Sequence, residues 1–256
     1  MYGAIVPSSG TVALIQSCNG GAWTQLTSLP GLVTKKPVSM AAWCDLLVLA
    51  AVDANGLVYI AWSRPAIGYF SGWRPTTMKS TNAPAIVGDP RSTALVLLMT
   101  GGATGQVLCY SMVQIDGVAN RVSTTACYAV SGAPATSDRP AAFVVAASPT
   151  CYTIALAVRG AGANANRIYY NDGLTPGWVD SGTVTASAPA IAVVNGNVWL
   201  GYQAADGSNM HGLPARNIWK SLPEGTVVGP CLSLSGGKLV DSYVLNGQAK
   251  VQLIQP

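Results

Sequence analysis

Three landmarks recur in the same order five times along this chain, and this repetition limits the folds open to it more than any other feature. Each repeat opens with an aromatic residue at the start of a predicted strand: Trp23, Trp73, Tyr128, Trp178 and Trp219. A proline that precedes an apolar strand follows 11–14 residues later: Pro37, Pro84, Pro140, Pro189 and Pro230. A hairpin tip rich in Gly or Asn completes the unit: Asn55-Gly56, Thr104-Gly105, Asn164–Asn166, Asp206-Gly207 and Asn246-Gly247. Such tips need backbone conformations that Gly and Asn adopt cheaply.

The clearest unit runs from Trp178 to Gly207 and reads as four short strands joined by tight turns. Successive aromatic landmarks lie roughly 40 to 55 residues apart, which is the repeat length of a propeller blade. The sequence therefore predicts an all-β fold, a β-propeller of four-stranded blades, as a single domain over residues 1–256. A sandwich of two packed sheets is the structural alternative, but sandwiches rarely repeat one set of landmarks five times.

The ends of the chain decide between five and six blades. The segment from Tyr2 to Gly21 holds an additional hairpin, with no proline-led strand before it. The final unit, from Pro230 to Pro256, offers three strands and no closing aromatic strand. We prefer six blades, the first and last incomplete, over five blades with one extra hairpin.

The composition agrees with strands and argues against helices and membrane spans. Half of the residues are apolar, only 9% are charged, and the single glutamate is Glu224. Helices usually keep Glu, Lys and Arg on their solvated face, whereas this chain is rich in Gly, Ser, Thr and Asn. No apolar run approaches the ~18 residues of a spanning helix. Insertion into a membrane is therefore not expected.

Charge and metal-ligand patterns exclude two further classes. The net charge is +4, and Lys35-Lys36 is the only basic doublet, so we expect no nucleic-acid partner. His211 is the only histidine, and no Cys-x-x-Cys occurs, so neither a metal site nor a cofactor is expected. The six cysteines lie mostly in apolar strand patterns, where both buried thiols and disulfides are open to them.

The unit Trp178-x-x-x-Gly182, followed by Ala188-Pro189-Ala190-Ile191 and Asp206-Gly207, resembles the repeat of propeller lectins. These are the Photorhabdus-type lectins and the six-bladed fungal fucose lectins. The segments Trp73–Gly105 and Pro37–Trp62 are also similar to it. The resemblance implies multiple glycan sites between blades, and glycans or glycoproteins on a cell surface as partners. In such a site an aromatic ring covers the C–H face of the sugar while charged side chains bind its hydroxyls.

The N-terminus has no basic segment followed by a long apolar one, so no signal peptide is visible. We nevertheless expect an extracellular or surface-exposed protein, because the glycans that such a chain would bind are found on cell surfaces. A cytoplasmic location is not excluded, and neither is a homo-oligomer.

Aromatic and basic residues recur together at three repeat junctions, and these are the candidate ligand-binding residues. Those of the first junction are Tyr59, Trp62, Arg64, Trp73 and Arg74. Those of the third are Arg167, Tyr169, Tyr170 and Trp178, with Asp180 beside them. Those of the fourth are His211, Arg216 and Trp219. For the landmark tryptophans the competing interpretation is packing between blades, and for His211 it is an ordinary surface histidine.

Two other functions compete with the lectin hypothesis. One is a non-catalytic attachment or interaction propeller, such as a viral or phage receptor-binding head, which could itself bind glycans. The other is a glycosidase, which needs two carboxyl groups roughly 5–10 Å apart. The best constellation of that kind is Asp138-Arg139 with Asp89 and Arg91, and no known catalytic motif contains it. We therefore predict that the protein is not an enzyme.

Overall fold

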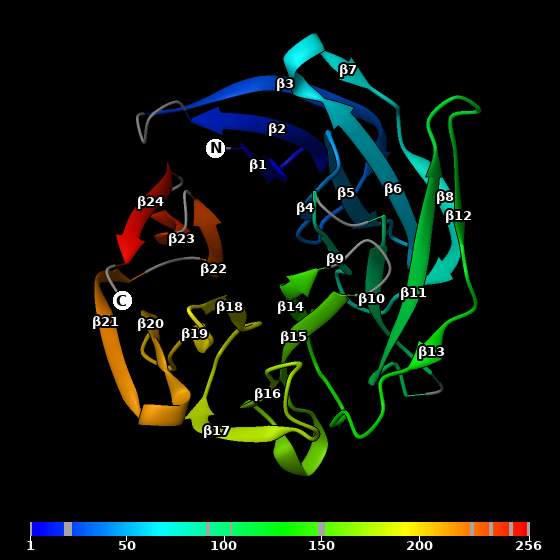
Figure 1. Cartoon of the computed structure of the whole chain (residues 1–256). Helices are drawn as coiled ribbons and strands as arrows, with labels where there is room; N and C mark the ends of the chain where they lie inside the picture. Colours follow the sequence, from blue (N-terminus) through cyan, green and yellow to red (C-terminus); the bar gives the residue numbers. More distant parts are fainter. Residues whose placement is uncertain are drawn as a thin grey trace. The chain divides into compact units, whose positions relative to one another are not determined.

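A computed structural model of the chain describes residues 2–17, 22–90, 93–102, 104–147, 152–225, 228–235, 238–245 and 248–254. The described residues form six antiparallel sheets, each a simple meander in chain order (Figure 1). Three short 3₁₀ turns are the only helical elements among them: η1 (Pro65–Ile67), η2 (Gly162–Asn164) and η3 (Pro214–Arg216). Within these residues no helix is long and apolar enough to cross a membrane.

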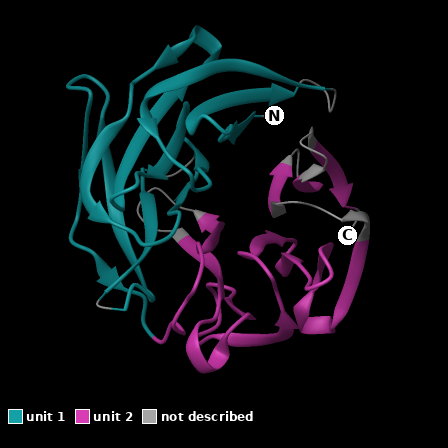
Figure 2. Cartoon of the chain, turned by 180° about the vertical axis from the view of Figure 1, so that it is seen from behind, with its two compact units in different colours: residues 1–131, 147–152 teal, residues 132–146, 153–256 magenta. Residues whose placement is uncertain are grey.

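The sheets divide between two compact units, drawn in teal and magenta in Figure 2. Unit 1 comprises residues 1–131 and 147–152, and unit 2 comprises residues 132–146 and 153–256. The prediction of a single domain over 1–256 stays a prediction.

Unit 1 contains the first three sheets. Blade 1 consists of β1 (Tyr2–Ile5), β2 (Thr11–Ser17) and β3 (Trp23–Val33). Blade 2 consists of β4 (Ser39–Trp43), β5 (Leu46–Val52), β6 (Leu57–Arg64), β7 (Tyr69–Phe70) and β8 (Arg74–Lys79). Blade 3 consists of β9 (Ala85–Gly88), β10 (Leu95–Gly101), β11 (Val107–Asp116), β12 (Arg121–Thr124) and β13 (Tyr128–Ala129). In blades 2 and 3 two short strands share the fourth position, because both pair with the third strand.

Unit 2 contains the remaining sheets. Blade 4 consists of β14 (Ala141–Ala147), β15 (Tyr152–Arg159), β16 (Arg167–Asn171) and β17 (Val179–Val184). Blade 5 consists of β18 (Ala190–Val194), β19 (Asn197–Gln203), β20 (Ser208–Leu213) and β21 (Ile218–Gly225). Blade 6 consists of β22 (Val228–Ser235), β23 (Lys238–Leu245) and β24 (Gln248–Ile254).

This architecture confirms the predicted fold class, an all-β propeller, with six blades. Blades 1 and 6 are three-stranded, as the incomplete terminal repeats predicted. The landmarks have the expected places. Strands β4, β9, β14 and β18 begin within two residues of a landmark proline, and the aromatic landmarks begin or adjoin the outer strands. The predicted tip Asn246-Gly247 lies outside the described residues.

Within each unit, neighbouring blades bury a shared hydrophobic core. Val12, Leu14 and Leu29 of blade 1 pack with Leu49 and Ala61 of blade 2. The opposite face of blade 2 packs on blade 3, through side chains that include Val48, Ile60, Trp62, Leu95 and Leu97. Equivalent clusters join blade 4 to blade 5 and blade 5 to blade 6. Full burial of one such side chain stabilises the fold by about 1.5–3 kcal/mol, so the core between blades is what holds each unit together.

The described cysteines form neither the fully buried thiols nor the disulfides that the sequence left open. Cys44, Cys127 and Cys231 are exposed and Cys109 is half-buried. None of these four forms a disulfide, while Cys18 and Cys151 lie outside the described residues. Cys44 lies in a hairpin turn and Cys127 in a loop. Apolar neighbours in the sequence therefore did not mean that these two cysteines belong to a buried strand. Burial, reinforced by the Cys127 side chain, raises the pKa of Cys109 to about 12.

Candidate functional site

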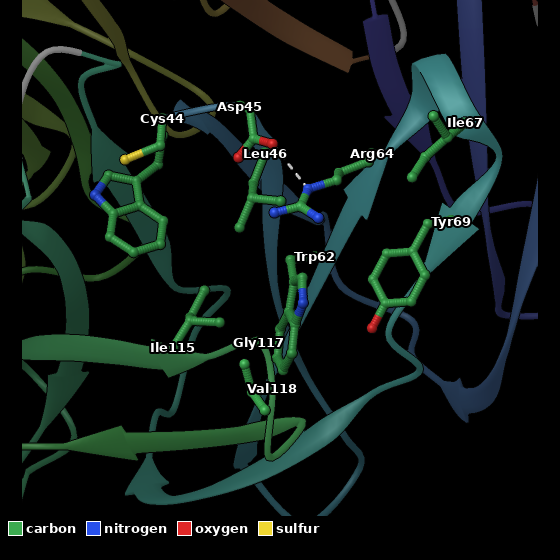
Figure 3. A pocket seen from close by; sticks show the side chains of 11 residues that line it. Cys44, Asp45, Leu46, Trp62, Arg64, Ile67, Tyr69, Ile115, Gly117 and Val118 are labelled. Atoms are coloured by element: carbon green, nitrogen blue, oxygen red, sulfur yellow. Dashed lines mark ion pairs between the residues drawn. The ribbon is translucent and has the colours of Figure 1, made fainter.

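A cavity of about 550 Å³ lies in unit 1, between blades 2 and 3 (Figure 3). A cavity of this volume falls in the range typical of small-molecule sites. Its lining comes from the β4–β5 turn, β6, η1 and β7 of blade 2, and from β11 and the β11–β12 hairpin of blade 3. The lining residues are Trp43, Cys44, Asp45, Leu46, Trp62, Arg64, Ile67, Tyr69, Ile115, Gly117 and Val118.

The turn between β4 and β5 brings a carboxylate to the cavity. Trp43 pairs with Leu46, so Cys44 and Asp45 form a two-residue loop. Cys44 has φ +51°, a left-handed conformation that costs energy for a residue with a Cβ atom. Such strain persists only where the surrounding structure imposes it, and it accumulates at functional sites. Here it accompanies the placement of the Asp45 side chain in the cavity wall.

Arg64 supplies the cationic group of the site. It is the last residue of β6, directly before η1, and its Nε lies 2.8 Å from Asp45 Oδ2. The two side chains are 50% and 67% exposed, so their pairing contributes little to stability. The pair instead fixes the orientation of the guanidinium. Within the described part of the chain its two Nη groups make no further ion pair or hydrogen bond, and they point toward Trp62 in Figure 3.

Aromatic side chains form the adjoining wall. Trp62 belongs to the core between blades 2 and 3 and is only 1% exposed, so it forms the floor of the cavity. Tyr69, on β7, is exposed and lies beside Arg64 in Figure 3. A cation beside aromatic faces is a geometry that binds a ring with one apolar face and several hydroxyl groups.

The β11–β12 hairpin closes the cavity on the side of blade 3. Asp116 Oδ1 accepts hydrogen bonds from the backbone N–H groups of Val118 (3.0 Å) and Ala119 (2.9 Å), which shape the tip. Arg74 Nε donates to the Asn120 carbonyl (3.1 Å), and Asn120 Nδ2 donates to the Ser71 carbonyl (3.3 Å). The tip is therefore bound to blade 2 through Asn120, and Arg74 supports the cavity without lining it.

The other predicted residues of the first junction lie away from the cavity. Tyr59 and Trp73 pack in the core between blades 1 and 2, on the opposite face of blade 2. Trp73 is buried, its Nε1 donates to the Leu29 carbonyl (3.2 Å), and its ring meets Phe70 edge-on. The structure thus gives Trp73 the packing role that competed with ligand binding.

The third junction forms a separate group within blade 4. Arg167 Nη2 and Asp180 Oδ2 lie 2.6 Å apart, and the hydrogen bond to Asp180 holds the pKa of Arg167 above its usual value. Tyr170 is buried in the core against blade 5, while Tyr169 and Trp178 are half-buried. Because Asp180 already engages Arg167, the pair resembles a bridge between β16 and β17 more than an open site.

At the fourth junction the histidine is a core residue. His211 is buried, its ring lies 6.4 Å from that of Trp199, and burial together with Lys220 lowers its pKa. His211 is therefore a buried residue and not the ordinary surface histidine that the sequence also allowed. Trp219 packs edge-on against Tyr202 at 5.2 Å, and Arg216 is exposed on η3.

Sequence reasoning therefore found two of the lining residues, Trp62 and Arg64. It missed Trp43, Asp45, Ile67, Tyr69 and Val118, among others. A usable signal was present for some of them, since a two-residue gap between the apolar runs 39–43 and 46–52 predicts a hairpin at Cys44-Asp45. No comparable sequence feature predicted that Ile115, Gly117 and Val118 of blade 3 would line the same cavity. Among the described residues no group of three His, Cys, Asp or Glu side chains gathers in a way that could hold a metal.

Comparison with solved structures places the chain among six-bladed propellers. The SapL1 lectin in complex with α-methyl fucoside is 13% identical, with a TM-score of 0.54 over 100% of this chain and 96% of that one. A fungal lectin from Aleuria aurantia, described as a six-bladed β-propeller with a novel fucose recognition mode, is 10% identical (TM-score 0.54; 98% and 89% covered).

An α-L-arabinanase from Penicillium chrysogenum, complexed with arabinobiose, matches equally well (12% identity; TM-score 0.58; 97% and 86% covered). No protein-family model matches the chain, and no curated protein matches its sequence. At these identities the likeness establishes the fold alone.

Proposed function

We propose that this protein is a carbohydrate-binding propeller and that the cavity between blades 2 and 3 is its glycan site. The observation that carries the proposal is the Arg64 guanidinium, oriented by Asp45, beside Trp62 and Tyr69. The exposed Tyr69 ring offers a surface for the C–H face of a pyranose, above a floor formed by Trp62. The Nη groups and the Asp45 carboxylate offer partners for its hydroxyls.

The similar structures suggest which sugar to test first. Two of those compared are lectins whose descriptions name fucose or a fucoside, and a third is an arabinanase bound to an arabinose disaccharide. We infer that α-L-fucosides are the first candidates. Glycans on a cell surface are the expected partners, which implies a protein that acts outside the cell or on a surface. An attachment head that binds such glycans is a variant of this proposal.

We also infer that the site binds without catalysis. Glycoside hydrolysis needs two carboxyl groups about the scissile bond, and Asp45 is the only carboxylate among the lining residues. Asp138, the best acid proposed from the sequence, instead accepts a hydrogen bond from the Arg139 backbone N–H (2.7 Å) and pairs with Arg159 (3.5 Å). Both contacts give it a structural role.

The direct test is the substitution Arg64→Gln, assayed by calorimetry with methyl α-L-fucoside. One ring and a few charge-assisted hydrogen bonds predict weak monosaccharide binding, with a Kd of about 10 µM to 1 mM. Loss of the guanidinium should weaken binding about 10-fold or more, since hydrogen bonds to charged groups contribute about 1.5–3 kcal/mol. Arg64 is exposed, so the thermal unfolding of the variant should be unchanged.

Arg121→Gln is the matched control, because Arg121 is an exposed arginine of unit 1 that does not line the cavity and the change in charge is identical. It should leave binding intact. Equal losses in the two variants would contradict the assignment of the site to this cavity. If no glycan binds at millimolar concentration, either to the protein or across a glycan array, the proposed function is wrong.

A further inference from the structure

The cavity is divided into a polar part and an apolar part. The Arg64–Asp45 pair lies at one end, and Ile115 and Val118 lie at the other, with Trp62 between them (Figure 3). Ile67 adds another apolar side chain to the wall. A ligand made only of hydroxyl groups would find partners at the first end and none at the second.

Two apolar side chains of the cavity wall are strongly exposed. Val118 is 101% exposed and Ile67 is 71% exposed, the two highest values among the large hydrophobic residues of the described chain. Leaving such side chains in water forgoes the stabilisation that their burial would give. Scattered exposed hydrophobics are common, but Val118 lies with Ile115 at one end of a cavity (Figure 3), and together they form a surface suited to an apolar group.

Local structure keeps both side chains in place. The tip that carries Val118 is shaped by Asp116 and bound to blade 2 through Asn120 and Arg74. The turn that carries Ile67 ends at Gly68, whose φ of +66° allows its N–H to donate to the Pro65 carbonyl (3.2 Å). These hydrogen bonds fix the backbone that presents both side chains to solvent, so a bound ligand is one way to cover them.

We propose that the cavity takes a glycoside with an apolar aglycone, with the sugar at the Arg64–Asp45 end and the aglycone against Val118 and Ile115. This rests on the proposed function and specifies its ligand class. The volume of about 550 Å³ corresponds to a drug-sized ligand, larger than a single sugar ring. An ordinary glycan would fill the polar end alone, whereas a glycolipid-like or aryl glycoside would occupy both.

The test compares methyl and n-hexyl α-L-fucoside by calorimetry, with n-hexanol as the probe without a sugar. The hexyl fucoside should bind about 10-fold more tightly than the methyl fucoside, since a few buried methylene groups at about 0.8 kcal/mol each exceed the 1.4 kcal/mol of a tenfold change. Hexanol alone should not compete with either fucoside at the concentrations used.

Val118→Ser should remove most of the preference for the hexyl fucoside and leave the affinity for the methyl fucoside unchanged. Val33→Ser is the matched control, because Val33 is also an exposed valine of unit 1 and does not line the cavity. It should change neither affinity. Val118 makes no core contact, so the variant should fold as the parent does.

Each other outcome has a distinct meaning. Equal affinities for the two fucosides would overturn this inference and leave the proposed function standing. Competition by hexanol as strong as by the hexyl fucoside would also overturn it, since the occupant would then need no sugar. Equal effects of Val118→Ser and Val33→Ser would show that the aglycone does not bind in this cavity. Failure of both fucosides to bind would count against the proposed function as well.

Discussion

Asp241 is the residue whose environment departs most from what its chemistry prefers. It lies in β23 with no exposed surface, and within the described chain neither carboxylate oxygen makes a hydrogen bond. The backbone amides of Cys231 and Ser242 are near enough to lower its pKa slightly, but they do not approach at hydrogen-bonding geometry. Burial dominates and raises the pKa of Asp241 to about 7.

This pKa predicts a stability that falls as the pH rises. The unfolded chain releases the proton near pH 3.8 and the folded chain near pH 7, so the unfolded state is increasingly favoured between these values. Asp241→Asn should therefore raise the free energy of unfolding by a few kcal/mol at pH 8 and by little at pH 4. Urea denaturation at both pH values measures the difference.

Asp206 is a useful comparison because its pKa is shifted in the opposite direction to that of Asp241. Hydrogen bonds from the Ser208 side chain and backbone lower the pKa of this exposed carboxyl, so its contribution is present at neutral pH and is lost in acid. Asp206→Asn should therefore not stabilise the protein at pH 8. If Asp206→Asn stabilised the protein as much as Asp241→Asn does, the explanation by burial of the Asp241 charge would be wrong. It would also be wrong if the stability of Asp241→Asn depended on pH as that of the parent does.

At the scale of single elements, the β11–β12 hairpin determines whether the cavity has a wall on the side of blade 3. Its tip depends on a few polar contacts to blade 2 and on little apolar packing, because Asp116, Gly117, Val118 and Ala119 are all exposed. Segments with few buried apolar contacts open most readily by local unfolding. The Arg74–Asn120 hydrogen bond is one of two contacts that tie the tip to blade 2, the other being from Asn120 to Ser71.

Arg74→Met should loosen the hairpin without unfolding blade 2. The variant keeps the apolar stem and loses the hydrogen bond, at a cost of about 1 kcal/mol. Amide exchange over residues 116–121 should become several-fold faster, and binding of the hexyl fucoside should weaken with it. Arg121→Met, an exposed arginine at the start of β12, is the control. Unchanged exchange in Arg74→Met would show that the contact does not hold the tip.

At the scale of the whole molecule, the repeats differ at the positions that form the cavity. In blade 5 the turn that corresponds to Cys44-Asp45 is Asn195-Gly196, and Leu213 precedes the 3₁₀ turn where Arg64 does so in blade 2. The blade 2 ion pair therefore has no counterpart in blade 5. The prediction of several glycan sites between blades stays a prediction, and we expect the site in unit 1 to be the one that binds.

Calorimetry with methyl α-L-fucoside should accordingly give one ligand per chain, and agglutination should require self-association of the protein. Avidity without new contacts needs several linked sites, which one site per chain cannot supply. A stoichiometry of two or more would instead support multiple sites, and the group around Arg167 and Trp178 in blade 4 would be the next to substitute.

The sequence by itself determined the order and the kind of the strands. Proline-led strands, hairpin tips and outer aromatic residues depend on local backbone preferences and on the alternation of side chains, and both can be read from a few neighbouring residues. The same alternation places Tyr59 and Trp62 on opposite faces of β6. The sequence therefore already showed that these two candidate ligand-binding residues could not belong to one site.

Only the tertiary structure decided which of those faces meets a cavity. The site combines Asp45 and Arg64, which the register of β5 and β6 brings together, with Val118 from a different blade. The position of Val118 depends on how two sheets pack and on the hydrogen bonds of Arg74 and Asn120. No local preference encodes such contacts, because their energies arise between segments that meet only after each blade has formed.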